Sequence, residues 1–209
     1  MLFPLQVTVT MTPPIFLTIY VCGFLFAASI RLWYTQEYRR KMKEIKWKPA
    51  LDTWLVYLPA LGFFIIPAIY ILTPFLAAAD YTLPVWAGWA GAALFAAALL
   101  LLWRSHADLG ANFTPVAVVQ EGQRLVTTGV YRYIRHPMYA AHFLWAFAQP
   151  LLLWNWIAGF ALLITFIPLY YIRVPVEEGV LAGRFGKDYQ EYMERTGRIV
   201  PKFGQARNR

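Results

Sequence analysis

Five apolar stretches alternate with polar segments along the chain. They cover residues 14–34, 52–76, 83–103, 137–154 and 156–172. A helix needs roughly 20 apolar residues to cross the hydrocarbon core of a bilayer, and each stretch approaches that length. The pattern therefore predicts an all-α integral membrane protein with about five transmembrane helices.

The composition agrees with this prediction. Hydrophobic residues make up 59% of the 209 positions and charged residues only 14%, which lies well outside the average for soluble proteins. No repeat and no low-complexity linker divides the chain, so we expect one membrane domain over 1–209. Within it, 1–104 holds the first three helices, and 105–209 holds a long polar loop, a helical hairpin and an amphipathic helix.

The basic residues are grouped on alternate connections. Lys and Arg occur in 31–48, 104–135 and 173–209, while the loop near Asp80 and the turn at 154–156 contain none. The positive-inside rule then places the N-terminus outside and the C-terminus in the cytoplasm. The net charge of +8 is explained by this topology. We therefore expect contacts with membrane lipids and no nucleic-acid partner.

The start of the chain has no basic residue before its first apolar stretch and no small-residue cleavage pattern. A removable signal peptide is therefore not expected, and the first helix is retained. The longest polar segment, 105–136, is predicted to be a cytoplasmic loop, and connections of this length usually bind something.

An amphipathic helix is expected after the fifth apolar stretch. Pro175 suits the first turn of a new helix, and apolar residues then recur at helical spacing. These residues are Val176, Val180, Leu181, Phe185, Tyr189, Tyr192 and Met193. Such a helix rests at the membrane interface or over the bundle, although Gly186 weakens its continuity.

Arg135, His136 and Tyr139 surround Pro137, which can begin the fourth helix because its missing N–H costs nothing there. Free backbone amides and the helix dipole at such a start favour an anion, and a guanidinium adds a bidentate site. An Arg and Tyr anchor at the membrane interface explains the same residues equally well. The histidine is the residue that an anchor does not explain.

Arg173 and Glu177 form a second candidate pair at the end of the fifth apolar stretch. Their separation of four residues allows an ion pair if the helix continues through Pro175, whereas a kink would separate them. Ionisable residues buried within a membrane are usually functional, whereas ionisable residues at the membrane interface are common and need no special role. The sequence leaves both interpretations open.

Metal and phosphate motifs do not occur in the sequence. His106 and His142 are assigned no role, and the spacing of His and Cys residues predicts no metal site. No Gly-x-Gly triplet is present, so the usual phosphate-cradling turn is absent as well. A nucleotide-like cofactor must then be held in another way.

The C-terminal half carries three motifs in a characteristic order. "LGANF", "LVTTGVYRYIRHPMY" and "EEGVLAGRFGKDYQEYMERTGR" resemble the isoprenylcysteine carboxyl methyltransferase family, integral membrane enzymes that use S-adenosylmethionine. The resemblance covers roughly 105–200 and rests on a Gly-x-Tyr, an Arg-His-Pro-x-Tyr, a paired Glu and a Phe-Gly-x-x-Tyr element. The first two helices show no comparable signature.

The resemblance assigns roles to individual positions. It implies that 105–209 is the catalytic part, that Arg173 binds the substrate, and that Glu177 binds the cofactor in a catalytic role. The residues implied to bind the cofactor are Gln120, Gln123, Arg124, Leu125, Val126, Tyr131, His136, Pro137, Met138, Tyr139 and Glu177.

The activity implied by the resemblance is S-adenosyl-L-methionine-dependent methylation, at the cytoplasmic face, of a carboxylate on a lipidic or prenylcysteine-like acceptor. N-methylation of phosphatidylethanolamine is the alternative, because related phospholipid methyltransferases share the Arg-His-Pro-x-Tyr element. Arg173 favours a carboxylate, since an amine acceptor needs no guanidinium. An NADPH-dependent sterol-type reductase, generally a longer chain, and a non-enzymatic membrane protein are further alternatives. The natural acceptor and the oligomeric state stay open.

Overall fold

The computed structural model describes residues 11–41, 57–114 and 122–202. The elements are α1 (Pro14–Lys41), a π-helical turn η1 (Leu61–Ile65), α3 (Ile66–Leu72), the 3₁₀ turns η2 (Pro74–Ala79), η3 (Gly110–Asn112) and η4 (Gly129–Arg132), and the helices α4 (Val85–Leu109), α5 (Pro137–Leu153), α6 (Trp156–Phe185) and α7 (Lys187–Arg195). Only two isolated β-bridges occur among the described residues. The all-helical class is confirmed over this part of the chain.

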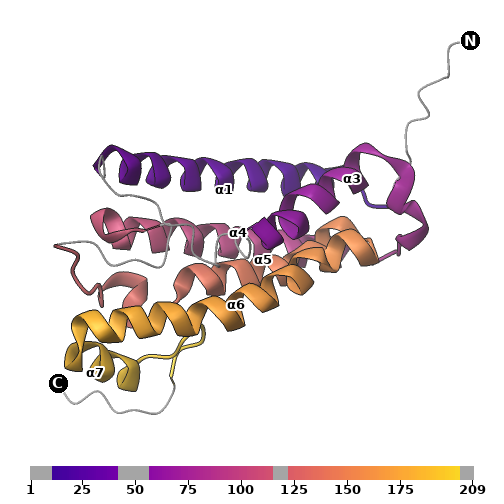
Figure 1. Ribbon diagram of the computed structural model, residues 1–209. Coiled ribbons are helices and arrows are strands. Elements are labelled where there is room, and N and C mark those ends of the chain that lie inside the picture. The colour runs from indigo at the N-terminus through magenta and orange to yellow at the C-terminus, as the bar shows by residue number, and fades with distance from the viewer. Residues whose placement is uncertain (1–10, 42–56, 115–121, 203–209) are drawn as a thin grey trace, which may run out of the picture.

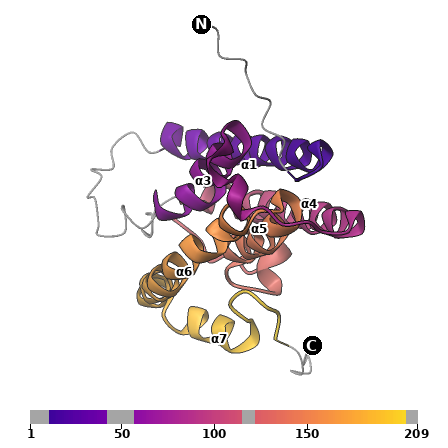
Figure 2. The same cartoon turned by 90° about the vertical axis from the view of Figure 1, so that its right-hand side faces the viewer.

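The helices form a layered bundle (Figure 1). In both views α1 and α3 lie on one side, α4 and α5 in the middle, and α6 on the other side with α7 beyond it (Figure 2). Helix α5 contacts α1, α4 and α6, so it is the centre of the bundle. Three described helices, α1, α4 and α6, are long and apolar enough to cross a membrane, whereas α5 has 17 residues. The protein is an integral membrane protein with helical spans.

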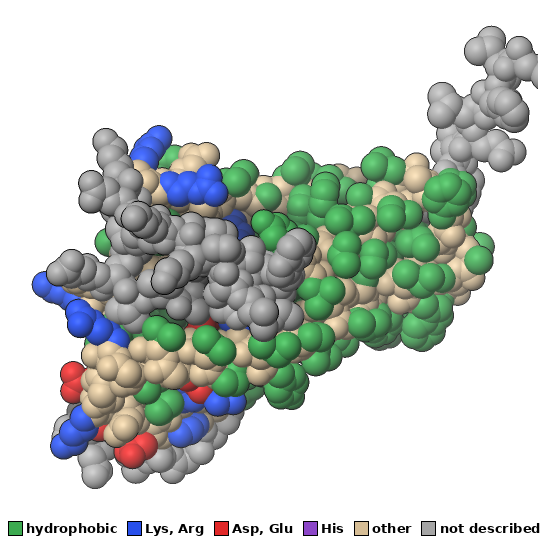
Figure 3. Space-filling model, viewed as in Figure 1, with side chains coloured by type: hydrophobic (Ala, Val, Ile, Leu, Met, Phe, Trp, Pro, Cys, Tyr) green, Lys and Arg blue, Asp and Glu red, His purple; other side chains and the backbone are tan. Residues whose placement is uncertain are grey.

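Short polar contacts hold the turns together at one end of the bundle. Asn155 Nδ2 donates to Asp80 Oδ1 at 2.7 Å, Met11 N donates to Asp80 Oδ2 at 3.3 Å, and Thr12 Oγ1 donates to the Leu153 carbonyl at 2.6 Å. Charged side chains gather instead at the other end, near α7, while apolar side chains cover most of the remaining visible surface (Figure 3). Successive crossings of the bundle alternate in direction between these two chemically different ends (Figure 1).

A polar contact inside the apolar core explains the π-helical turn. Gln149 is fully buried, and its Nε2 donates to the carbonyls of Gly62 at 2.9 Å and Ala158 at 2.6 Å. Tyr20 donates to the Phe63 carbonyl at 2.7 Å. Widening of the helix at η1 frees the carbonyls of Gly62 and Phe63, and neighbouring helices satisfy them, as the bilayer interior requires. A Cβ on Gly62 would lie 2.6 Å from the Leu162 backbone, so glycine permits this close approach to α6.

Helix α6 differs from the expectation at its C-terminal half. It runs without a break through Pro168 and Pro175 to Phe185, so the prediction of a new helix beginning at Pro175 was wrong. The break comes at Gly186, whose φ of +54° suits glycine, and α7 follows. In α7, Tyr189 and Tyr192 are buried, whereas most of its other residues are exposed, so this short helix is amphipathic.

The loop expected from residue 105 begins later. Helix α4 continues through Arg104 and Ser105 to Leu109, because Ser105 and His106 are fully buried and extend its packed face. Helix α5 begins at Pro137 as the sequence predicts, with His136 as its N-cap residue. Segments 110–114 and 122–136 therefore connect two helices at the charged end of the bundle.

Candidate active site

A cavity of about 380 Å³ lies at this charged end. Its wall is formed by α1, the helix over 57–72, the segments between α4 and α5, the start of α5, and the second half of α6. The volume falls within the range typical of small-molecule sites. One part of the wall carries charged and polar side chains, and another carries aromatic and aliphatic ones. The cavity can therefore hold a ligand with both polar and apolar groups.

The cavity brings together most of the residues singled out from the sequence. Eight of them line its wall: Gln123, Tyr131, His136, Pro137, Met138, Tyr139, Arg173 and Glu177. Arg124, Leu125 and Val126 are not among the lining residues. Arg124 is exposed, and its backbone N–H donates to Asn112 Oδ1 at 2.9 Å. Gln120 lies outside the described residues.

Arg173, Glu177 and Tyr139 form a hydrogen-bonded set in the wall. Because α6 continues through Pro175, Arg173 Nε donates to Glu177 Oε1 at 2.7 Å. Tyr139 Oη donates to the same carboxylate oxygen at 3.0 Å. Arg173 is only 8% exposed, so it is a buried cavity residue and not an ordinary interface anchor. Glu177 remains 21% exposed and faces the cavity.

Glu178, the next residue along the chain, binds a different set of groups. Its Oε1 accepts from Arg135 Nε at 3.1 Å and Nη2 at 3.0 Å, and lies 3.2 Å from His136 Nε2. Its Oε2 accepts from Arg198 Nε at 3.0 Å and Nη2 at 2.7 Å. Arg135 also donates to the carbonyls of Met193 and Thr196. We call Arg135, Glu178, Thr196 and Arg198 the C-terminal clamp.

The clamp also fixes the backbone before α5. Arg135 N donates to the Gly197 carbonyl and His136 N to the Arg198 carbonyl, both at 2.8 Å. The sequence offered Arg135 as a site for an external anion or as a membrane anchor. In the structure, the guanidinium of Arg135 binds the carboxylate of Glu178 instead. His136 lies between the two glutamates, because its Nδ1 is 3.8 Å from Glu177 Oε2.

Three hydrogen bonds fix the wall between α4 and α5. Tyr131 Oη donates to the Ser105 carbonyl at 3.2 Å, and Tyr192 Oη donates to the Tyr131 carbonyl at 2.6 Å. Burial raises the pKa of Tyr131 well above its usual value, so the phenol stays protonated and acts as a donor. Gln123 Nε2 donates to the Asn112 carbonyl at 3.1 Å. Gln123 and Tyr131 are thereby held at the cavity wall.

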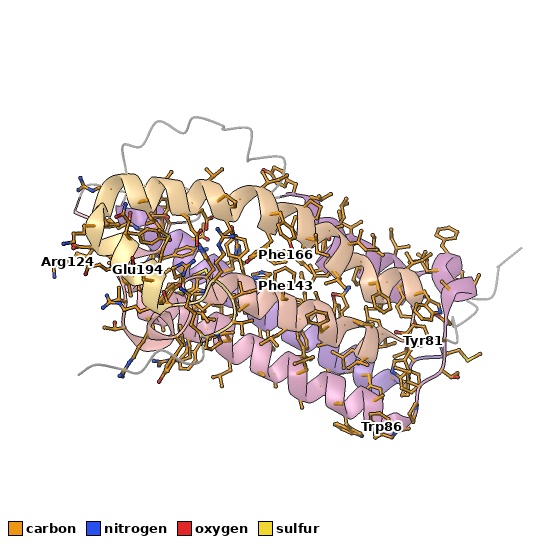
Figure 4. All side chains as sticks on the ribbon, turned by 90° about the horizontal axis from the view of Figure 1, so that it is seen from below. Tyr81, Trp86, Arg124, Phe143, Phe166 and Glu194 are labelled. Carbon is orange, nitrogen blue, oxygen red and sulfur yellow. The ribbon has the colours of Figure 1, made fainter. Side chains whose placement is uncertain are left out.

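The apolar wall lies deeper between α5 and α6. The His142 ring stacks on Phe166 with centroids 5.1 Å apart, and Phe143 meets Phe166 edge-on at 5.1 Å (Figure 4). His142 Nδ1 lies 2.7 Å from the Met138 carbonyl. A carbonyl only accepts, so His142 Nδ1 carries a proton and donates to it. His142 and Phe166 both line the cavity.

Sequence analysis did not assign three of these cavity residues. His142 received no role, although it follows Tyr139 by three residues and therefore shares its helix face. Asn112 carried no signal beyond the "LGANF" motif. Arg31 was counted among the topology-determining cations, yet it lies inside the apolar stretch 14–34 and lines the cavity. The position of this arginine within a membrane-spanning stretch was the feature of the sequence that could have indicated a functional role.

One solved structure with a similar fold is that of the eukaryotic intramembrane Ras methyltransferase ICMT. The similarity covers 88% of this chain and 67% of that chain, with a TM-score of 0.53 and 23% sequence identity. At this identity the likeness shows a shared fold. It agrees with a helical bundle embedded in the membrane.

Sequence comparisons match part of the chain to protein-S-isoprenylcysteine O-methyltransferases. The chain is 34% identical over 94 residues to protein-S-isoprenylcysteine O-methyltransferase B of Arabidopsis thaliana, which covers 44% of this chain and 48% of that protein. It is 30% identical over 107 residues to the Schizosaccharomyces pombe enzyme, covering 44% and 45%, and 34% identical over 94 residues to the Homo sapiens enzyme, covering 44% and 33%. The chain thus spans about half or less of the length of these relatives.

The model of the isoprenylcysteine carboxyl methyltransferase (ICMT) family matches residues 89–183. This segment runs from α4 to the end of α6 and includes Arg173, Glu177 and Tyr139. The family model, the sequence relatives and the fold agree, so residues 89–183 of this chain are similar to the ICMT family.

Proposed function

We propose that this protein is a membrane S-adenosyl-L-methionine-dependent methyltransferase that esterifies a carboxylate on a lipidic, prenylcysteine-like acceptor. The observation that carries the proposal is the buried set of Arg173, Glu177 and Tyr139 in a cavity with one polar and one apolar wall. The set lies within the segment that matches the family. The relatives are protein-S-isoprenylcysteine O-methyltransferases, and the acceptor proposed here follows from them.

The cavity residues fit the proposed cofactor. Glu177 offers a carboxylate to its ammonium or hydroxyl groups, while the first turn of α5 at Met138 and Tyr139 has no side-chain cap and suits its carboxylate. Gln123 and Tyr131 complete this wall. When bound, S-adenosyl-L-methionine supplies a methyl group on a sulfonium, and the electron pair of the broken C–S bond returns to sulfur.

The residues of the chain then have only to bind and orient the acceptor. A carboxylate is already ionised, so no general base is required and no proton moves. Arg173 holds and orients the acceptor carboxylate, while the pair with Glu177 keeps the guanidinium in place. The aromatic wall at His142 and Phe166 binds the apolar part of the acceptor and excludes water. Positioning and desolvation supply most of the rate.

The proposed topology has five membrane crossings with the N-terminus outside and the C-terminus in the cytoplasm. It is supported by the antiparallel helices and by the lack of Lys and Arg in the turns near Asp80 and Asn155. The charged end with the cavity then faces the cytoplasm. The cofactor enters from the cytoplasm, and the acceptor enters sideways from the bilayer. Residues 105–209 supply most of the catalytic groups.

The experiment uses the purified full chain in lipid with methyl-labelled S-adenosyl-L-methionine. An S-prenylcysteine acid and phosphatidylethanolamine are offered separately, and the products are treated with base. Volatile label released by base supports a carboxyl methyl ester and the proposal. Base-stable label in the lipid fraction supports N-methylation instead, and no transfer to either acceptor contradicts the proposed reaction.

Arg173→Ala tests the acceptor-binding role in the same assay. We expect turnover to fall by roughly 100-fold, because a charge-assisted hydrogen-bonded contact is lost, while cofactor affinity stays nearly unchanged. The matched control is Arg184→Ala, an exposed arginine on the same helix, which should behave like the wild type. Loss of cofactor affinity in Arg173→Ala would assign Arg173 to the cofactor.

A further inference from the structure

Arg31 presents a second guanidinium to the cavity from α1. It lines the wall together with Arg173, Tyr139 and His142. It also lies close enough to each of these three groups for electrostatic interaction. Arg31 precedes the segment 89–183 that matches the family, so the comparison of sequences assigns it nothing.

The charges around the cavity do not balance. Arg173 is paired with Glu177 at 2.7 Å, whereas no ion pair found between described residues includes Arg31. Arg31 is exposed and lines the cavity, as expected for a group that projects into it. An arginine within a membrane stretch is costly unless it faces such a cavity and meets an anion. Among the described residues, the wall therefore carries one positive charge beyond the Arg173–Glu177 pair.

We propose that Arg31 is a specificity-determining residue that binds the acceptor carboxylate together with Arg173. Two guanidiniums beside one another repel, and a carboxylate between them converts this repulsion into two attractions. The same arrangement disfavours a cationic amine. The inference rests on the proposed function, and it adds that α1 selects anionic acceptors.

The two arginines contribute differently. Arg173 is held through Nε by Glu177, so its orientation is fixed within the wall. Arg31 comes from a different helix, α1, and lines the same cavity as Arg173. A group that adds binding without changing the reacting geometry affects acceptor affinity more than turnover. We therefore expect Arg31 substitutions to raise KM for the acceptor and to change kcat little.

The test compares the binding of an S-prenylcysteine acid with that of its carboxamide to the full chain in lipid. The wild type should prefer the acid, because only the acid places a negative charge between the arginines. Arg31→Gln should reduce this preference by roughly 10-fold or more, since a charged hydrogen-bonded contact is lost. Arg31→Lys, which keeps the charge but not the planar fork, should give an intermediate preference.

Arg39→Gln is the matched control, because Arg39 is exposed near the end of the same helix. It should bind both probes like the wild type, and cofactor affinity, measured separately, should be unchanged in every variant. An acid preference that survives in Arg31→Gln overturns the inference, as does a loss of cofactor affinity in that variant. If the preference depends on Arg31 while the wild type transfers no label to any acceptor, the inference stands and the proposed reaction fails.

Discussion

Two adjacent glutamates on α6, Glu177 and Glu178, bind different partners: one lies at the cavity and the other in the C-terminal clamp. Glu177 faces the cavity, is 21% exposed and accepts hydrogen bonds from Arg173 and Tyr139. Glu178 faces the C-terminal clamp, is 9% exposed on its side chain and accepts from Arg135 and Arg198 on both oxygens. Consecutive helix residues point about 100° apart, so one turn of α6 reaches both regions.

The comparison separates an ion pair that borders a ligand-sized cavity from one that lies within the C-terminal clamp. In the clamp, side-chain bonds are joined by backbone bonds from Arg135 and His136 to 197–198, and the groups satisfy one another. In the cavity, the carboxylate is shared between two donors and borders a space large enough for a ligand. Only the groups at the cavity can replace a contact within the protein by a contact with a ligand while the fold stays closed.

The largest effect should come from breaking the clamp with Glu178→Gln. Removing this charge leaves Arg135, which is 8% exposed on its side chain, beside an uncharged amide. The expected loss is about 3–5 kcal/mol of unfolding free energy, because one partner of a buried ion pair stays uncompensated. Denaturant unfolding in mild detergent measures it. Glu191→Gln, at a side chain 58% exposed, is the matched control and should be neutral. Equal stability of both variants would show that the clamp is only a surface contact.

Glu177→Gln should affect binding and spare stability, which sharpens the contrast between the two glutamates. Cofactor affinity should weaken by roughly 10-fold, because a charged contact becomes a neutral one while the side-chain shape is kept. The unfolding free energy should change by less than about 1 kcal/mol, since the partly exposed carboxylate is screened. Equilibrium binding of S-adenosyl-L-methionine and denaturant unfolding provide the two readouts. Unchanged affinity would remove Glu177 from the cofactor site.

Arg198→Ala should give the smallest effect and test the outer half of the clamp. The hydrogen bond to Glu178 raises the pKa of Arg198, so the guanidinium stays charged throughout the working pH range. Its side chain is 49% exposed, so the ion pair is screened by water and contributes about 1 kcal/mol or less. Arg195→Ala, which changes an exposed arginine on α7, is the reference variant for the loss of unfolding free energy. A loss as large as that of Glu178→Gln would mean that Arg198, and not Arg135, holds the clamp together.

The comparison also shows why the sequence distinguished the two sites only in part. The i to i+4 spacing allowed Arg173 and Glu177 to pair only if the helix continued through Pro175, and the structure shows both the continuous helix and the pair. No local pattern indicated that Arg135 binds Glu178, since these residues are 43 positions apart. Local spacing fixes contacts within a helix, but contacts between helices depend on how the helices pack.

The sequence by itself determined the class of the protein, the position of most helices and the motif-bearing residues that line the cavity. These depend on apolar stretch lengths, on Pro137 at a helix start and on short motifs, all of which are local. The tertiary structure decided that α6 passes through Pro175 and breaks only at Gly186. It also decided that Arg31 from α1 reaches the cavity. Packing between helices satisfies the backbone groups that prolines and π-turns release, and it places charges from distant segments in one space.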